Sequence, residues 1–360
     1  MSRARQHPGL ILALVCLPVF IGALDLTIVS AVLPEVIRSM TIEIQKLDVA
    51  GWVVTGYFVS YAISMTFMGK VSDLAGRRIV YLACLAVFFV GSWLVAASPG
   101  WPAAVAASVV PMAGGDPTLS PLYALIGGRI VQALGAGAMV PVSMALVADL
   151  FPPARRALPL GIVGAVDTAG WVLGHLYGGV MVQFMAWPWL FWINLPVVGV
   201  IFAATWWGLA GLPRTETRGR IDWIGVLFIG AALLLLNVGL GSPEMGLDGV
   251  SDAPASGRLW WVLGAVAAFA LFLASQWRRT APLLDLRIFA NRNVSAASAA
   301  NLLVGFCIMV ALVSVPLFIN VAGGADTMQA ALVTGYLLCA FTVPMALAAG
   351  RAGTPWRLHL

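Results

Sequence analysis

Long apolar runs, separated by short polar segments, recur along the whole chain. Crossing the roughly 30 Å hydrocarbon core of a bilayer takes about 20 helical residues, and each run reaches that length. Because no water satisfies backbone groups in that core, each run is predicted to be a helix. Ten spans are predicted, at residues 10–33, 51–69, 79–97, 120–147, 158–183, 189–212, 223–241, 259–277, 294–319 and 329–349.

The composition agrees with a membrane protein. Of the 360 residues, 61% are apolar and only 10% are charged, and the mean hydropathy is +0.96. These values lie far outside the range of soluble globular domains. We therefore predict an all-α polytopic membrane protein, with the lipid bilayer as its first partner.

The basic residues predict the orientation of the spans. With the N-terminus inside, all but four of the 20 Lys and Arg residues fall in cytoplasmic segments, the exceptions being Arg38, Lys46, Arg129 and Arg258. Cytoplasmic loops of membrane proteins carry this excess, so both termini are expected in the cytoplasm of a multi-pass protein of the cell membrane. The scatter of arginines over several short loops argues against a nucleic-acid surface, despite the net charge of +5.

Residues 98–119 interrupt the regular pattern. Their apolar part, 103–113, is too short to span and lies between Pro102 and Pro111. An eleventh crossing here would invert every later loop. We predict an extracytoplasmic or interfacial insertion.

Three charged residues lie within predicted spans: Asp25, Arg129 and Asp167. Each would cost roughly 2.5–3.5 kcal/mol at a helix centre facing lipid, so we expect them to face a shared polar cavity. A carboxylate surrounded by hydrocarbon favours its protonated form, whereas a nearby arginine favours the ionised form, and this opposition suits proton exchange. The alternative is a structural ion pair that holds spans together.

One face of the span at 158–183 combines small and polar residues. Gly170, Gly174 and Gly178 recur every four residues, and Gly179 follows them; such spacing lets a second helix approach closely. Asp167, Trp171 and His175 share the adjoining strip at the same spacing. The glycines predict a pivot or simple tight packing, and His175 is either a proton relay or a hydrogen-bonding core residue.

The polar segment at 69–78 reads GKVSDLAGRR and lies between two spans. It resembles the loop signature of the major facilitator superfamily, with Gly69, Asp73, Gly76, Arg77 and Arg78 in the expected places. The resemblance implies a cytoplasmic gate, in which the arginines pair with an acid such as Asp149. The alternative is that the basic residues of this segment only set the membrane topology.

Further segments of the sequence form a recognisable set: Leu24–Pro34, Arg129–Gly137 with Gln132, Gly174–Gly179, Phe191–Pro196, Asp222–Gly225 and Pro282–Phe289. They are similar to segments of the drug:proton antiporters of that superfamily, which have fourteen spans. Their pattern has proline directly after the glycine that corresponds to Gly174, and this chain has His175 there instead. The insertion at 98–119 is also unusual for that family.

The resemblance implies a domain plan. Residues 1–212 would form a six-helix N-terminal half, 213–280 two bridging helices, and 281–360 the first two helices of a second half. The repeat of VTGY at 54–57 and 333–336 fits a second half related to the first. Because that half would need four more helices, the sequence predicts a truncated or fragmentary product.

The function implied by the resemblance is proton-coupled export of small amphipathic compounds or drugs by alternating access. Asp25 and Asp167 are candidate proton carriers, and Arg129, Gln132 and His175 complete the predicted cavity. The acids slightly favour cationic substrates, for which Tyr57 and other aromatics offer a pocket. The alternative is a transport-inactive remnant of such a transporter.

A membrane enzyme is the remaining class. The chain has no nucleophile motif or paired catalytic acids, and its four cysteines and three histidines lack metal-ligand spacing. We expect no enzyme activity, no metal and no cofactor, with a proton gradient as the driving force.

Overall fold

The computed structural model describes residues 8–43, 46–210, 221–241, 255–279 and 282–323. These residues form helices and connecting turns, and no strand occurs among them. Eight helices within these ranges are long and apolar enough to cross a membrane. The all-α polytopic architecture predicted from the apolar runs is confirmed.

The spanning helices extend past the apolar runs at most ends, because backbone hydrogen bonding continues beyond the hydrocarbon. A further helix, α10 (Arg292–Gly323), covers the predicted span at 294–319, whereas the one at 329–349 and the second VTGY segment lie outside the described residues. The eight are α1 (Pro8–Ser39), α2 (Leu47–Ala75), α3 (Arg77–Ala97), α5 (Ser120–Leu150), α6 (Ala157–Met181), α7 (Pro188–Gly208), α8 (Trp223–Gly241) and α9 (Ala255–Arg278).

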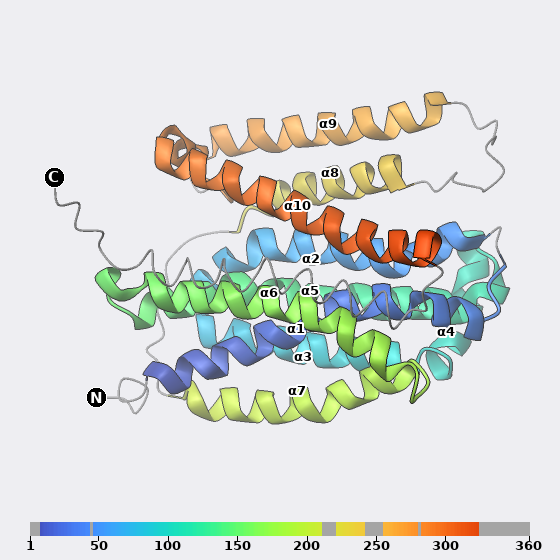
Figure 1. Cartoon of the computed structure of the whole chain (residues 1–360). Coiled ribbons are helices and arrows are strands. Elements are labelled where there is room, and N and C mark those ends of the chain that lie inside the picture. The colour runs from blue at the N-terminus through green and yellow to red at the C-terminus, as the bar shows by residue number, and fades with distance from the viewer. Residues whose placement is uncertain (1–7, 44–45, 211–220, 242–254, 280–281, 324–360) are drawn as a thin grey trace.

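The insertion at 98–119 contains a short helix, α4 (Trp101–Val109), followed by 3-10 turns at Val110–Ala113 and Pro117–Leu119. At nine residues α4 is too short to cross a bilayer. It packs beside α5, at the opposite end of the bundle from the start of α1 (Figure 1).

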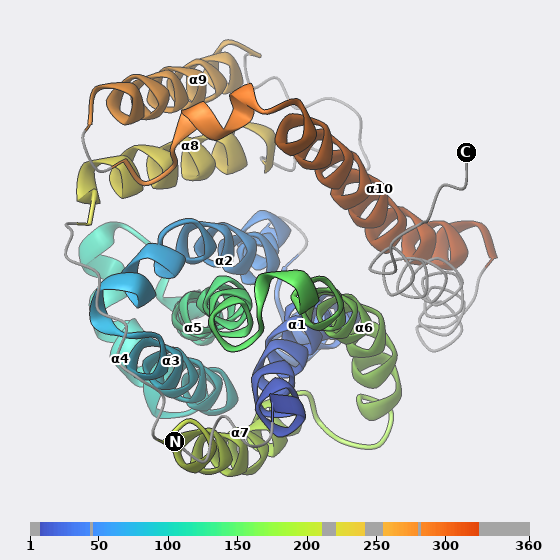
Figure 2. The same ribbon diagram turned by 90° about the vertical axis from the view of Figure 1, so that its left-hand side faces the viewer.

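One bundle, which Figure 2 shows nearly end-on, is formed by α1, α2, α3, α5, α6 and α7. The most extensive contacts join α1 to α6, α3 to α5, and α2 to α5. Helices α8 and α9 pair with each other outside this bundle, and α8 also contacts α2. The functional candidates therefore lie in two places, inside the six-helix bundle and at its N-terminal end.

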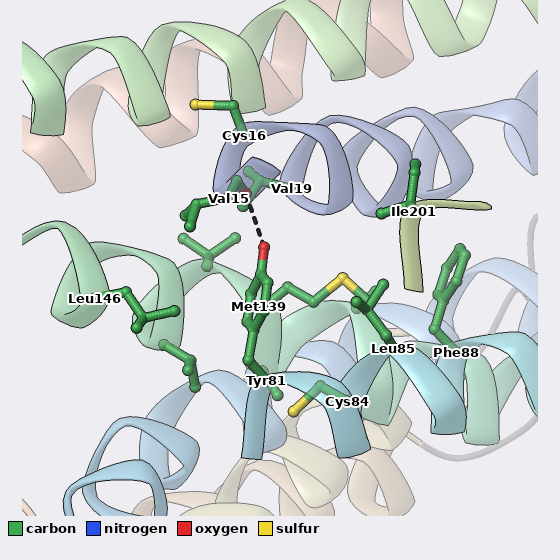
Figure 3. Packing of buried hydrophobic residues seen from close by; sticks show 14 of the residues in the cluster. Val15, Cys16, Val19, Tyr81, Cys84, Leu85, Phe88, Met139, Leu146 and Ile201 are labelled. Carbon is green, nitrogen blue, oxygen red and sulfur yellow. Dashed lines mark hydrogen bonds between the residues drawn. The ribbon is translucent and has the colours of Figure 1, made fainter. Parts of the chain in front are cut away.

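Interlocking apolar side chains from α1, α3, α5 and α7 form the core of the bundle (Figure 3). Tyr81, Phe88 and Met139 are each at most 1% exposed, and the hydroxyl of Tyr81 donates to the carbonyl of Val15 at 2.8 Å. Lipid is as apolar as these side chains, so close packing and interhelical hydrogen bonds, not water exclusion, hold the helices together. That rigid core fixes the buried charged residues.

Candidate functional site

Asp25 on α1 and Arg129 on α5 meet inside the bundle. The guanidinium of Arg129 donates to the carboxylate of Asp25 at 2.6 Å, and both residues are 0% exposed. A second guanidinium nitrogen lies 3.4 Å from the backbone carbonyl of Asp25. The pair therefore joins α1 to α5 through both side chain and backbone.

Gln132 completes the pair one helical turn along α5. Its oxygen accepts from Arg129 at 2.7 Å, and its amide donates to Asp25 at 2.9 Å and to the hydroxyl of Ser92 at 2.8 Å. The amide of Asn194 on α7 lies 3.4 Å from the same carboxylate. Four helices thus supply polar groups to one buried network.

Aromatic rings close this network from two sides. The guanidinium carbon of Arg129 lies 3.8 Å from the ring centre of Tyr57 and 5.9 Å from that of Phe191. A cation over an aromatic face is attracted to it, most strongly where water is excluded. Tyr57, a predicted member of an aromatic substrate pocket, instead covers the buried arginine.

The structure pairs Asp25 with Arg129, and a cavity that these two share with Asp167 stays a prediction. The first two are enclosed by side chains, and the fixed hydrogen bonds around them offset part of the free energy lost when two charges leave water. No hydrogen bond or ion pair among the described residues links Asp167 to them. The two acids lie in different environments.

Asp167, Trp171 and His175 follow one strip of α6, as their spacing predicts. Each has a buried polar atom without a hydrogen-bond partner in the described structure: Oδ1 of Asp167, Nε1 of Trp171 and Nδ1 of His175. Buried polar atoms normally find a partner in protein or water. The strip therefore has unused hydrogen-bonding capacity for water or a ligand.

The other nitrogen of His175 is engaged. Its Nε2 lies 3.2 Å from the hydroxyl of Ser30 on α1, and the residue is 6% exposed. One turn away, Thr27 donates to the carbonyl of Trp171 at 2.8 Å. These two contacts are the polar links of the α1–α6 interface.

Glycines bring α1 and α6 into close contact. A Cβ added at Gly174 would lie 2.2 Å from the carbonyl oxygen of Leu24 and 2.2 Å from the hydroxyl of Thr27. Gly170 and Gly178 meet α1 in the same way, and Gly179 is also buried. Only glycine fits at this spacing, and a pivoting role stays a prediction.

The segment at 69–78 is more helical than the predicted polar loop. Helix α2 continues through Ala75, and only Gly76 separates it from α3. Gly76 has φ of +95°, a conformation that side chains with a Cβ rarely adopt. Its glycine is therefore needed for the turn, whereas Gly69 lies within α2.

Arg77 connects three helices at this end of the bundle. It pairs with Asp73 at 2.7 Å and with Asp149 at the end of α5. The contact with Asp149 is present, and its role as a gate stays a prediction. Arg78 goes elsewhere, since it donates to the carbonyl of Trp206 at 2.8 Å and lies 5.2 Å from that indole ring.

Sequence reasoning missed several partners of these residues. Ser92 and Asn194 lie in apolar spans, and a polar residue in such a run was the available signal. No sequence feature could identify Trp206 as the partner of Arg78, because the acceptor is its backbone carbonyl. Which helix faces Arg78 depends on packing alone.

Two mycobacterial proteins match most of this chain in sequence. A triacylglyceride transporter of Mycolicibacterium smegmatis is 33% identical over 92% of the chain and 55% of its own length. A triacylglyceride transporter of Mycobacterium tuberculosis is 33% identical over 88% of the chain and 57% of its own length. The chain thus spans little more than half the length of these relatives.

A solved structure shares the fold. The proton:xylose symporter bound to 6-bromo-6-deoxy-D-glucose superposes with a TM-score of 0.53 at 14% identity, over 95% of this chain and 69% of that one. The family model of the Major Facilitator Superfamily matches residues 15–358. The eight described helices that are long and apolar enough to span a membrane fit this family. The chain belongs to the major facilitator superfamily.

Proposed function

We propose that this chain acts in proton-driven secondary transport and exports amphipathic molecules by alternating access. The observation that carries the proposal is the contrast between two membrane-embedded acids. Asp25 is neutralised by Arg129 at 2.6 Å, whereas Asp167 keeps a buried oxygen without a partner. Two carboxylates in different environments can be ionised at different stages of one cycle.

Asp167 is the first candidate for the coupling proton. Its charge lacks the fixed donors that Asp25 has, so a proton or a cationic group of the substrate is the natural partner. His175, two turns along the same strip, is a candidate relay through its free Nδ1. Asp25 would exchange a proton only when Arg129 moves away from it.

Alternating access needs contacts that can be exchanged between two states. The α1–α6 interface carries both the glycines and the candidate relay, so sliding there would move Asp167 relative to Asp25. At the N-terminal end, the cytoplasmic gate formed by Asp73, Arg77 and Asp149 would open and close with it.

The names of the relatives favour a lipid-like substrate. Both are described as triacylglyceride transporters, which suits an apolar molecule with a small polar head better than a strongly charged drug. Drug-like amphipathic cations, implied by the sequence resemblance, are the second class. The relatives are longer than this chain, so the proposal concerns transport in which these helices take part.

The test uses the full chain in proteoliposomes with a pH-sensitive dye and a fluorescent acylglyceride or a cationic dye as probe. We expect transport of at least one probe to require an imposed pH gradient and to move protons in the opposite direction. Asp167→Asn should uncouple the two fluxes. Gradient-independent transport, or no transport by protein whose helical circular dichroism is intact, would overturn the proposal.

A further inference from the structure

A cavity at the end of α9 lies apart from the transport residues. It has a volume of about 710 Å³ and lies between the last turn of α9 and the 3-10 helix Leu286–Ala290. Its wall holds three arginines, Arg278, Arg279 and Arg287, together with Trp277 and the single acid Asp285. No hydrogen bond or ion pair among the described residues joins these side chains to the Asp25 network.

A buried polar network holds this cavity in shape. Asp222 and Gln276 are 2% and 3% exposed, and the amide of Gln276 donates to the Asp222 carboxylate at 2.9 Å. Asp222 also accepts from the backbone of Gly225 at 3.0 Å and so caps α8. The start of α8 is thereby tied to the end of α9.

The same glutamine fixes the segment that follows α9. Its oxygen accepts from the backbone nitrogens of Leu283 at 2.6 Å and Leu284 at 3.1 Å. Two segments singled out in the sequence, Asp222–Gly225 and Pro282–Phe289, thus meet at Gln276. The chain after α9 is folded back over the helix end, and the arginines face a formed cavity.

The arginines differ in how far they are already neutralised. Arg279 pairs with Asp222 at 3.0 Å. The side chains of Arg278 and Arg287 have no ion pair among the residues placed by the structure. One carboxylate oxygen of Asp285 accepts a hydrogen bond from the backbone nitrogen of Arg287 at 3.0 Å. The cavity therefore carries an excess of positive charge that suits an anion.

The position of the cavity indicates which anion is available. It lies where a spanning helix ends, and Trp277 there is 78% exposed, as aromatic residues at a membrane interface are. The start of α1 and the α2–α3 turn lie at the same end (Figure 1), and Lys70 of α2 donates to the carbonyl of Pro282. The basic residues predict this end to be cytoplasmic, where the leaflet holds anionic lipids.

We propose that this cavity binds the phosphate of an anionic phospholipid headgroup. Arg278 and Arg287 would contact the phosphate, because a planar guanidinium matches two phosphate oxygens at once. Arg279, which pairs with Asp222, would form the rim of the cavity. Trp277 would lie beside the glycerol of the phospholipid. A soluble phosphorylated compound offers the same chemistry without the acyl chains.

The experiment measures lipid binding by the purified full chain in a neutral detergent, by native mass spectrometry and thermal shift. We expect phosphatidylglycerol to bind and raise the melting temperature, and phosphatidylcholine to do neither. Arg278→Gln with Arg287→Gln should weaken phosphatidylglycerol binding at least about tenfold, since both phosphate ligands are lost. Both side chains are exposed, so the variant is expected to fold, and its melting temperature without lipid checks this.

Arg155→Gln is the matched control. Arg155 is exposed at the same end of the bundle, outside the cavity, and its loss should leave lipid binding unchanged. Equal binding of the two lipids, or an equal loss in the control, would overturn the site. If glycerol 3-phosphate binds as tightly as phosphatidylglycerol, the lipid assignment is wrong and the cavity takes a soluble phosphate.

Discussion

Arg129 and Asp25 form an ion pair at 2.6 Å in which neither side chain is more than 1% exposed. The two residues come from different helices and are 104 positions apart in the chain. Burying both charges is tolerable because Gln132 and Tyr57 surround them with a hydrogen bond and a ring face. The pair is thus a structural element and a candidate switch at once.

Breaking this pair from either side should destabilise the protein unequally. A buried pair that loses one partner typically costs about 3–5 kcal/mol. A carboxylate left alone by Arg129→Gln can take up a proton, whereas the guanidinium left by Asp25→Asn cannot lose one. We expect Asp25→Asn to lower the melting temperature in detergent more than Arg129→Gln does.

The double variant supplies the control for that comparison. With both charges removed, no unpaired charge remains, so the double variant should melt above Asp25→Asn alone. Equal melting temperatures for the two single variants would show that the lone arginine is not the costly species.

Asp167→Asn should separate coupling from stability. The buried oxygen of Asp167 has no partner to lose, so the melting temperature is expected to stay the same or rise. Proton-driven transport in proteoliposomes should fall to the level of downhill flux. A variant that is destabilised and still coupled would place Asp167 in the scaffold instead.

Gly174→Ala tests the close contact between α1 and α6. The new Cβ would lie 2.2 Å from two atoms of α1, and overpacking of this kind costs typically about 1–3 kcal/mol. Gly164→Ala on the same helix is the control, since nothing lies within 4 Å of its Cβ position. We expect only Gly174→Ala to lower the melting temperature; a loss in the control alone would contradict the packing.

The ion pair between Arg77 and Asp149 can be tested by exchanging its charges. Arg77→Glu places like charges together and should weaken transport and lower stability by up to about 1 kcal/mol, as expected for a partly exposed pair. Adding Asp149→Arg restores the attraction in reverse, and the rescue is expected to be partial because the new glutamate at position 77 still faces Asp73. Transport assays that find no rescue in the double variant would show that the position, not the pairing, matters.

A second ion pair, at the opposite end, predicts a pH dependence. Lys46 contacts Asp116, and this hydrogen bond lowers the pKa of Asp116 to about 2 from 3.8 and raises the pKa of Lys46. A lowered carboxyl pKa stabilises the fold above the unfolded value of 3.8 and loses that effect as the pH falls toward 2. The Lys46 contribution is present below 10.5 and is lost as the pH rises above it.

The measurement compares the wild type with Asp116→Asn. The wild type should melt higher at pH 6, and the difference should shrink as the pH falls from 4 to 2. Asp48→Asn, at a nearby position outside this pair, serves as the control. A difference that is constant across this range would show that the charge of Asp116 does not act through Lys46.

The sequence alone determined the class, the superfamily and, within the described residues, the helical spans of this protein. Helix formation in a bilayer depends on local composition, since each segment satisfies its own backbone, so runs such as 79–97 coincide with α3. The turn at 69–78 was located by its glycines and charges. Only its extent was wrong, because α2 continues as a helix to Ala75, beyond the apolar run.

Only the tertiary structure decided which buried polar residues meet. Asp25, Arg129 and Asp167 look alike in the sequence, as charges within spans, and the prediction put them in one cavity. The rotation of each helix about its axis, set by glycine contacts and side-chain packing far along the chain, joins Arg129 to Asp25 and leaves an oxygen of Asp167 without a partner. Local sequence cannot specify that rotation, because it depends on the shape of every neighbouring helix.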